Sequence, residues 1–314
     1  MTHRRPTKWF AFGFGAFVYV VALLFSTQVG GQTTQRKLAI TVDDLPGFGP
    51  LSPATRTAAN ARLLAALTDR SLHATGFVVC ANAASQDPVL QAWIANGMEL
   101  GNHTDRHRDL HTTSPEEWPA GVEQCHARLS QMTGKSARYF RYPMLHQGTT
   151  TEQRNAANAV LSRLGYTIAH VTADNSDYLL AQAYDRALRM NDAQQRDRIA
   201  RDYMEHMLGS VRHFDAVGEA EFGRRLPQVL LLHANTLAAD HLGSLLDALK
   251  AEGIQIVPLS EVLTDPFFAV EDTYTGPRGL SWFYRVRPGA FDRWGTWDDS
   301  ESARILATYL NNGQ

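Results

Sequence analysis

The chain has 314 residues, of which 44% are hydrophobic and 20% charged, and this composition excludes an intrinsically disordered protein. The net charge is −2, and the sequence lacks the strongly basic stripe that nucleic-acid binding requires. We therefore expect a globular protein with no nucleic-acid partner and a core large enough for one large or two modest domains.

Residues 1–31 have the features of an export segment. Three basic residues precede an uncharged run of 17 residues, 9–25, and small and polar residues follow. A basic leader before an apolar run is typical of a signal peptide, and 17 residues are also close to the minimum for a membrane span. We predict a periplasmic or extracellular protein, either cleaved near Gly30 or retained by an inner-membrane anchor. A buried N-terminal helix is the remaining alternative.

Beyond residue 31, strand-like and helix-like segments alternate. The predicted strands are 37–42, 73–79, 98–103, 137–143, 166–172, 228–235 and 254–260. The predicted helices between and after them are 55–70, 87–97, 115–132, 150–165 and 237–253. Seven strand–helix units favour a parallel α/β fold, either a barrel or a doubly wound sheet.

Two regions interrupt this alternation. Residues 179–224 are rich in Arg, Asp, Gln and Ala, and we expect two extra helices inserted between consecutive strands. Residues 266–314 are aromatic and loop-rich, and they are expected to wrap the domain or cover its opening.

The two cysteines, Cys80 and Cys125, leave two alternatives open. In an oxidising compartment they can form a disulfide. Cys80 ends a predicted strand and Cys125 lies in a predicted helix, so two buried free thiols are equally compatible with the sequence.

Polar side chains follow several predicted strands, and parallel α/β folds form their active sites at the carboxyl ends of strands. Asp43 and Asp44 follow the first strand, and His103 and His107 follow the third. Two imidazoles and one carboxylate are a usual ligand set for a hydrolytic Zn²⁺. Each pair alone has an ordinary explanation, as a turn or as a chance pair among 12 histidines.

Later strand ends continue the series. Arg141 and Pro143 lie at the end of the fourth strand, Asp174 and Asp177 come after the fifth, and His233 lies near the end of the sixth. Separately they can be a surface arginine, a polar turn and a core histidine. Together they predict one pocket at the carboxyl edge of the sheet.

These clusters resemble, in order, the five motifs of the polysaccharide deacetylases of the NodB-homology type, carbohydrate esterase family 4. The matching residues are Thr41, Val42, Asp43 and Asp44 for T-F-D-D; His103, Thr104 and His107 for H-[ST]-x-x-H; Arg141 and Pro143 for R-x-P; Asp174, Asp177 and Tyr178 for D-x-x-D-W; and Leu231 and His233 for L-x-H. The resemblance covers residues 37–265. It implies a distorted (β/α) barrel of about seven strands, a domain of residues 32–265 with the helical insertion, and a C-terminal extension packed on it.

The resemblance also implies chemistry, the removal of acetyl groups from N-acetylated carbohydrate. Asp44, His103 and His107 would hold a divalent metal, expected to be Zn²⁺. Asp43 would be the general base and His233 the general acid.

Further roles follow from the same resemblance. Asp177 would orient His233, and Arg141 would tune the base. The backbone N–H of Met144 is a candidate oxyanion donor. The other expected site residues are Pro143, Tyr178 and His146 near the substrate and Thr104 and Asp174 in support. The aromatic residues Trp282, Phe283, Tyr284, Trp294 and Trp297 are expected to stack on sugar rings or to pack the core of the extension.

Four positions depart from the family pattern and put the substrate in doubt. Leu45 replaces a glycine, Met144 a tyrosine, Tyr178 a tryptophan and Ala234 an aspartate. Peptidoglycan, chitin-like oligomers and a glucosamine polymer are the candidate substrates. The alternatives are an O-acetyl esterase, an amidase for a small non-sugar amide, and a non-catalytic carbohydrate-binding protein. The oligomeric state stays open.

Overall fold

The structure is a computed structural model that describes residues 1–3, 7–8, 35–84 and 86–311. The chain divides into two compact units, Met1–Thr33 and Thr34–Gln314, and the second carries the fold. The predicted export segment lies almost entirely outside the described residues. Among the described residues, no helix is long and apolar enough to cross a membrane.

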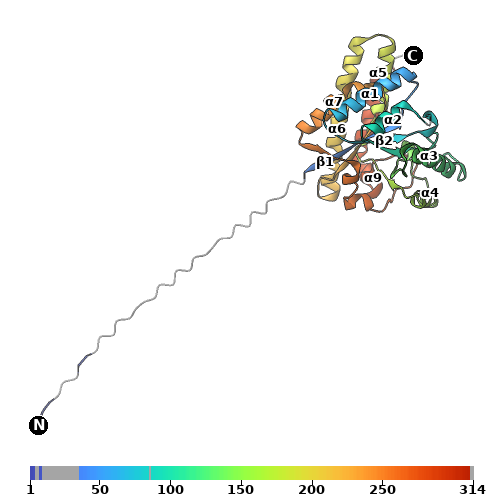
Figure 1. Cartoon of the computed structure of the whole chain (residues 1–314). Helices are drawn as coiled ribbons and strands as arrows, with labels where there is room; N and C mark the ends of the chain where they lie inside the picture. Colours follow the sequence, from blue (N-terminus) through green and yellow to red (C-terminus); the bar gives the residue numbers. More distant parts are fainter. Residues whose placement is uncertain (4–6, 9–34, 85, 312–314) are drawn as a thin grey trace. The chain divides into compact units, whose positions relative to one another are not determined.

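The described residues of the second unit form a sheet of seven parallel strands, which lies among helices in Figure 1. They are β1 Arg36–Leu45, β2 Ala74–Val78, β3 Glu99–Asn102, β4 Tyr139–Phe140, β5 Thr167–Ile168, β6 Gln228–His233 and β7 Ile254–Ile256. The order is β5-β4-β3-β2-β1-β6, and β7 pairs with the start of β1. A parallel bridge between Ala173 and Leu230 joins the segment after β5 to β6, so the circuit of strands closes. The predicted α/β fold with a distorted barrel is confirmed.

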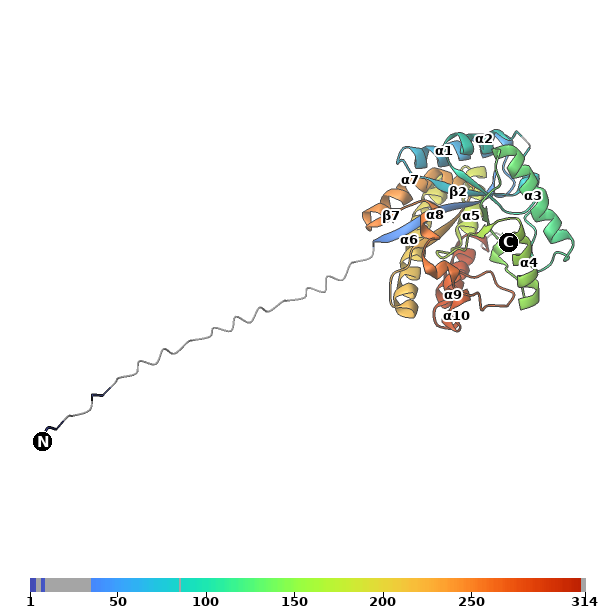
Figure 2. The same ribbon diagram turned by 60° about the horizontal axis from the view of Figure 1, so that its bottom comes forward.

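Helices surround these strands, with α1 and α2 on one side and α9 and α10 on the other (Figure 2). The helices are α1 Pro53–Thr68, α2 Pro88–Ala95, α3 Glu117–Thr133, α4 Thr151–Arg163, α5 Asp177–Arg189, α6 Ala193–Phe222, α7 Thr236–Ala251, α8 Leu259–Val262, α9 Trp282–Val286, α10 Ala290–Trp294 and α11 Thr296–Ile305. Helix α2 begins where its sequence predicts, because Asp87 accepts a hydrogen bond from the Val89 N–H and Pro88 takes the first helical position.

Strand β1 lies between β2 and β6 and is buried from Leu38 to Leu45. A strand covered on both faces has a nearly continuous apolar sequence, as this one does up to its carboxylates. Leu45 packs directly over Gly76 of β2, where an added Cβ would lie 2.2 Å from the Leu45 Cδ1 atom. The leucine that replaces the family's glycine is therefore a core residue, and Gly76 provides its space.

The two regions outside the alternation have different roles in packing. Residues 179–224 lie mainly in α5 and α6, as two consecutive helices. The extension packs on α6 through aromatic side chains, with the rings of Phe214 and Phe283 5.7 Å apart. Trp282, Phe283 and Tyr284 are buried, so core packing accounts for these three aromatic residues.

The cysteines form a disulfide between Cys80, just after β2, and Cys125 in α3. This resolves the alternative that the sequence leaves open. The bridge adjoins the loop after β3, since the Cys80 N–H donates to the Thr104 carbonyl and the His103 N–H donates to the Val78 carbonyl.

Candidate active site

The adjacent carboxylates lie inside β1, whereas the sequence places them in a turn after residue 42. The strand runs to Leu45, and its register with β2 shifts between Val42 and Leu45. At this irregularity Asp44 has a φ of 63°, a left-handed conformation that is uncommon for a residue with a side chain. The directions of the Asp43 and Asp44 side chains are therefore set by the distorted strand end. They do not follow the alternation of side chains along a regular strand.

Asp44, His103 and His107 converge on one point. Asp44 Oδ1 lies 3.7 Å from His103 Nε2 and 3.5 Å from His107 Nε2. Each residue offers one ligand atom, and these three atoms lie within 4.8 Å of one another. Ligand atoms about 2.1 Å from a tetrahedral Zn²⁺ are separated by about 3.4 Å. The spacing therefore fits a divalent metal ion.

Hydrogen bonding and burial prepare His103 as a ligand. Its Nδ1–H donates to the Arg141 carbonyl over 2.8 Å, which leaves the Nε2 lone pair for a metal. Burial lowers the pKa of His103 well below its usual range and also lowers the pKa of His107. Both imidazoles are therefore held neutral, the form that binds metal.

The loop after β3, which carries His103 and His107, has unusual backbone conformations. Thr104 and His107 have φ values of 64° and 55°. The Thr104 N–H donates to Asn102 Oδ1, and its hydroxyl accepts from the Arg108 N–H at 2.7 Å. Non-glycine residues in this region cost of order 1–3 kcal/mol each, and such strain concentrates at functional sites.

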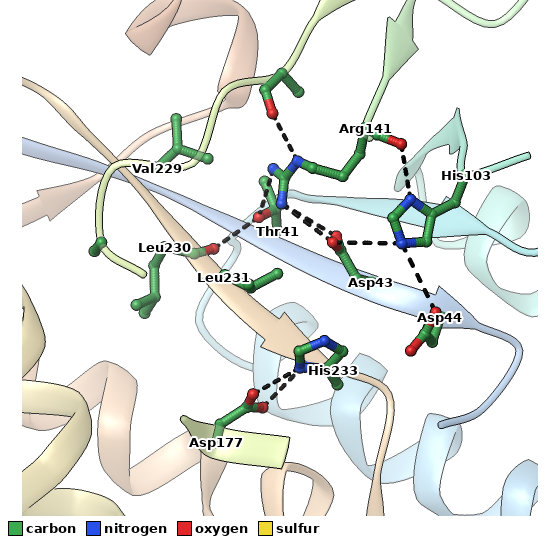
Figure 3. Close-up of polar contacts among 12 residues, drawn as sticks. Thr41, Asp43, Asp44, His103, Arg141, Asp177, Val229, Leu230, Leu231 and His233 are labelled. Atoms are coloured by element: carbon green, nitrogen blue, oxygen red, sulfur yellow. Dashed lines mark hydrogen bonds and ion pairs between the residues drawn. The ribbon is translucent and has the colours of Figure 1, made fainter. Parts of the chain in front are cut away.

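A fully buried arginine holds Asp43 (Figure 3). Arg141 Nη1 lies 3.3 Å from both carboxylate oxygens of Asp43, and Arg141 Nε donates to the Ala169 carbonyl. Burial raises the pKa of Asp43 to about 6, although the charge of Arg141 acts in the opposite direction. A carboxylate with a pKa near the working pH suits a general base.

His233 and Asp177 form an ion pair at the end of β6. The Nδ1 atom of His233 lies 2.6 Å from Asp177 Oδ1, and its backbone N–H donates to Asp177 Oδ2. Burial acts to lower the pKa of His233, but the charge and hydrogen bond of Asp177 outweigh it and raise this pKa to about 9. Within the described part of the chain, no hydrogen bond engages His233 Nε2, so that atom is available to donate a proton.

These groups meet at one cavity of about 380 Å³. Of the predicted site residues, those that line it are Asp43, Asp44, His103, His107, Met144, Asp174, Tyr178 and His233. Arg141 and Asp177 lie behind the lining, where each contacts a residue that does line the cavity. Thr104 and Pro143 are buried beside the site.

Met144 lies in the left-handed turn Pro143–Leu145, with a φ of 53°. The C-terminal extension approaches this turn closely at Gly279, where an added Cβ would lie 1.9 Å from the Met144 carbonyl oxygen. Only glycine leaves room for this approach, so the extension forms part of the cavity wall beside the candidate oxyanion donor.

His146 lies outside the cavity lining given by the described residues, in a second polar cluster with Asp109 and His111. Its Nδ1 atom lies 2.9 Å from Asp109 Oδ1, and His111 Nε2 accepts from the Gly148 N–H. The two imidazoles stack 4.0 Å apart at 7°. Lone pairs in two parallel ring planes do not converge on one ion, so the cluster is a hydrogen-bonded network.

Sequence reasoning missed the lining residues that come from outside the barrel. His206 comes from α6, and Arg278, Gly279, Trp297, Asp298, Asp299 and Ser302 come from the extension. They match no motif and are remote in sequence from the strand ends. The only signal was the aromatic content of residues 266–314, and among its predicted stacking residues Trp297 reaches the cavity.

Comparison with known proteins agrees with the motifs. Residues 30–169 match the family described as polysaccharide deacetylase. This segment is therefore similar to the polysaccharide deacetylase family. This match confirms the resemblance that the motifs predict. It also confirms the predicted enzyme class, a polysaccharide deacetylase-type hydrolase.

Solved structures support the fold of this deacetylase-type chain. Two mutants of a CE4 family pseudoenzyme, one with restored enzymatic activity, superpose with TM-scores of 0.53 and 0.52 at 14% and 16% identity. Each match covers 74% of this chain and 68% of the other.

Proposed function

We propose that this protein is an exported, metal-dependent deacetylase that hydrolyses N-acetyl groups of a carbohydrate, with Zn²⁺ as its metal. The observation that carries the proposal is the convergence of a metal-binding triad, a separate carboxylate and a histidine–aspartate pair on one cavity. Peptidoglycan, chitin-like oligomers and a glucosamine polymer are the candidate substrates.

A divalent ion held by Asp44, His103 and His107 would polarise the acetyl carbonyl and promote ionisation of water. Asp43 takes the proton of the attacking water, and Arg141 holds the carboxylate in place. His233 donates a proton from Nε2 to the leaving nitrogen, while Asp177 fixes its ring through Nδ1. The backbone beside Met144 is the candidate donor to the developing oxyanion.

The disulfide supports the proposed location. Structural disulfides persist in oxidising compartments and are rare in the cytosol. The bridge between Cys80 and Cys125 is fully inside the core, with exposures of 2% and 0%. We therefore infer that the catalytic unit works outside the cytoplasm, in the periplasm or beyond it.

The size of the cavity favours a second candidate, deacetylation of a small amide or an O-acetyl ester. Binding cavities usually span about 300–1,000 Å³, and this one, at about 380 Å³, is near the lower end. The same water attack serves both bonds, so the leaving group and substrate size distinguish them.

The test is acetate release by purified residues 32–314, with bound metal measured on the same samples. N-acetylated and O-acetylated glycans and small acetamides are compared, beside the His103→Ala variant. The proposal predicts stoichiometric metal and release from an N-acetyl glycan, with both lost in the variant. Metal binding with activity only on small amides or esters would favour the second candidate, and absence of both metal and activity would refute both.

A further inference from the structure

The loop that carries the Asp177 carboxylate is held from outside the barrel. Residues 174–176 connect the barrel to α5, whose first residue is Asp177. The hydroxyl of Ser210 in α6 donates to the Asp174 carbonyl at 2.7 Å. Two more contacts fix Ser176, and both come from the regions that interrupt the strand–helix alternation.

The first contact is a hydrogen bond from the Ser176 N–H to Nε2 of His206 in α6, with a length of 2.9 Å. The second joins the hydroxyls of Ser176 and Ser302, the latter in α11, at 2.7 Å. Ser176 is the N-cap residue of α5, yet its side chain makes no capping hydrogen bond to that helix. The Asn175 side chain accepts from the Asp177 N–H and donates to the Leu231 carbonyl of β6. The contacts with α6 and α11 add to this anchor and fix Ser176 itself.

His206 is built to accept this hydrogen bond. Its side chain is 1% exposed, and its Nδ1–H donates to Glu301 Oε2 at 3.1 Å. That bond fixes the tautomer whose lone pair is on Nε2, facing the Ser176 N–H. The Trp297 ring stacks on the imidazole, with centroids 5.6 Å apart and planes at 5°.

The position of Ser176 is transmitted directly to the candidate general acid. Asp177 is the next residue, and both of its carboxylate oxygens are engaged by His233, through Nδ1 and through the backbone N–H. The charge-assisted contact of 2.6 Å is short and sensitive to orientation. A shift of Ser176 would change this contact without touching any metal ligand.

We propose that His206 is a positioning residue for His233: by accepting the Ser176 N–H, it sets the location of Asp177 and so the orientation of the general acid. This inference rests on the proposed function. It assigns a catalytic purpose to the inserted helix and to the C-terminal extension, which supplies Glu301 and Ser302 to the same arrangement.

The test compares four variants of the full-length, zinc-loaded protein, two at His206, one at His213 and one at Ser302. His206→Leu removes the acceptor, whereas His206→Gln retains an acceptor at a similar reach. His213→Leu is the matched control, because His213 is also in α6 and stacks on Trp297 with centroids 4.7 Å apart, but it hydrogen-bonds Tyr284 instead of Ser176. Kinetics of acetate release and the NMR signal of the His233 Nδ1–H proton are both measured.

We expect His206→Leu to lower kcat about tenfold with KM unchanged, since loss of one positioning hydrogen bond corresponds to about one factor of ten. The His233 Nδ1–H signal should shift or broaden in this variant and not in His213→Leu, with both readouts largely restored in His206→Gln. Ser302→Ala, a smaller change, is expected to act in the same direction.

The inference is overturned if His206→Leu and Ser302→Ala both keep the kcat and the His233 Nδ1–H signal of the wild type. It is also overturned if His213→Leu changes these two readouts as much as His206→Leu does. A rise in KM alone would also overturn it, since that result indicates substrate contact. If the wild type releases no acetate, the proposed function fails, while the NMR comparison still decides the role of His206.

Discussion

At the scale of single residues, the site depends on two neighbouring carboxylates that face different partners. Asp43 contacts Arg141 and lies 3.7 Å from His103 Nε2, whereas Asp44 lies 3.7 Å from that same atom and 3.5 Å from His107 Nε2. The left-handed backbone at Asp44 turns its carboxylate toward the same cavity that Asp43 lines. Adjacent acids in a regular strand would point to opposite faces of the sheet, so the distorted strand end is required for both to reach one cavity.

The pKa of His233 leads to a prediction about pH. A folded-state pKa of about 9 exceeds the unfolded value of about 6.5, so the ion pair with Asp177 contributes stability that is fully present below pH 6.5 and is lost as the pH rises through 9. The free energy of unfolding of the metal-free protein should therefore fall by up to about 3 kcal/mol across this window.

Urea unfolding at pH 6.5 and pH 9.5 measures this difference, and Asp177→Asn is the comparison. The variant lacks the charge that raises the pKa of His233, so its stability should change much less between the two pH values. Equal pH dependence in the variant and the wild type would contradict the assignment of that pKa.

At the scale of elements, the sequence predicted best where a local signal decides the structure. Asp87 and Pro88 start α2 through a side-chain cap and a fixed φ, and both effects are local. The strand predicted at 166–172 is only Thr167–Ile168 in the structure. The chain beyond it turns to bridge β6 through Ala173, a distant contact that no local pattern reports.

The same distinction explains which site residues were found. His103 and His107 are four residues apart and are recognisable as a pair. His206 and Ser302 reach the site only because α6 and α11 fold back onto the loop before α5. Their contribution depends on tertiary packing, so composition and spacing did not reveal it.

The contact between the extension and the Met144 turn gives a prediction at this scale. Gly279→Ala places a methyl group against the Met144 carbonyl, and that group must displace the turn or the extension. We expect kcat to fall at least about tenfold, because displacements near 1 Å at a catalytic site can cost about a hundredfold. Metal content should be unchanged, since no metal ligand lies in either segment.

Gly209→Ala is the control for this substitution. It adds the same methyl group in α6, where the nearest atom, from Trp297, is 3.6 Å away and the contact is ordinary. Steady-state kinetics and metal analysis of both variants measure the effect. Normal activity in Gly279→Ala would show that the contact between the extension and the Met144 turn does not affect catalysis.

At the scale of the whole molecule, the barrel, the insertion and the extension contribute to one site. The barrel supplies the three candidate metal ligands, Asp43 and the histidine–aspartate pair from several strand ends. Helix α6 and the extension supply the outer wall of the cavity and hold the loop before α5. The family motifs specify the chemistry, and the parts outside the motifs shape the space in which a substrate binds.

The most direct test of the account compares Asp43→Asn with Asp44→Asn, measuring zinc affinity by titration and acetate release from an N-acetyl glycan on the same preparations. We predict that Asp43→Asn still binds zinc but loses nearly all activity, because only the proton acceptor is removed. Asp44→Asn should lose both zinc affinity and activity. Retained activity in Asp43→Asn, or unchanged zinc affinity in Asp44→Asn, would contradict the separate roles of the two carboxylates.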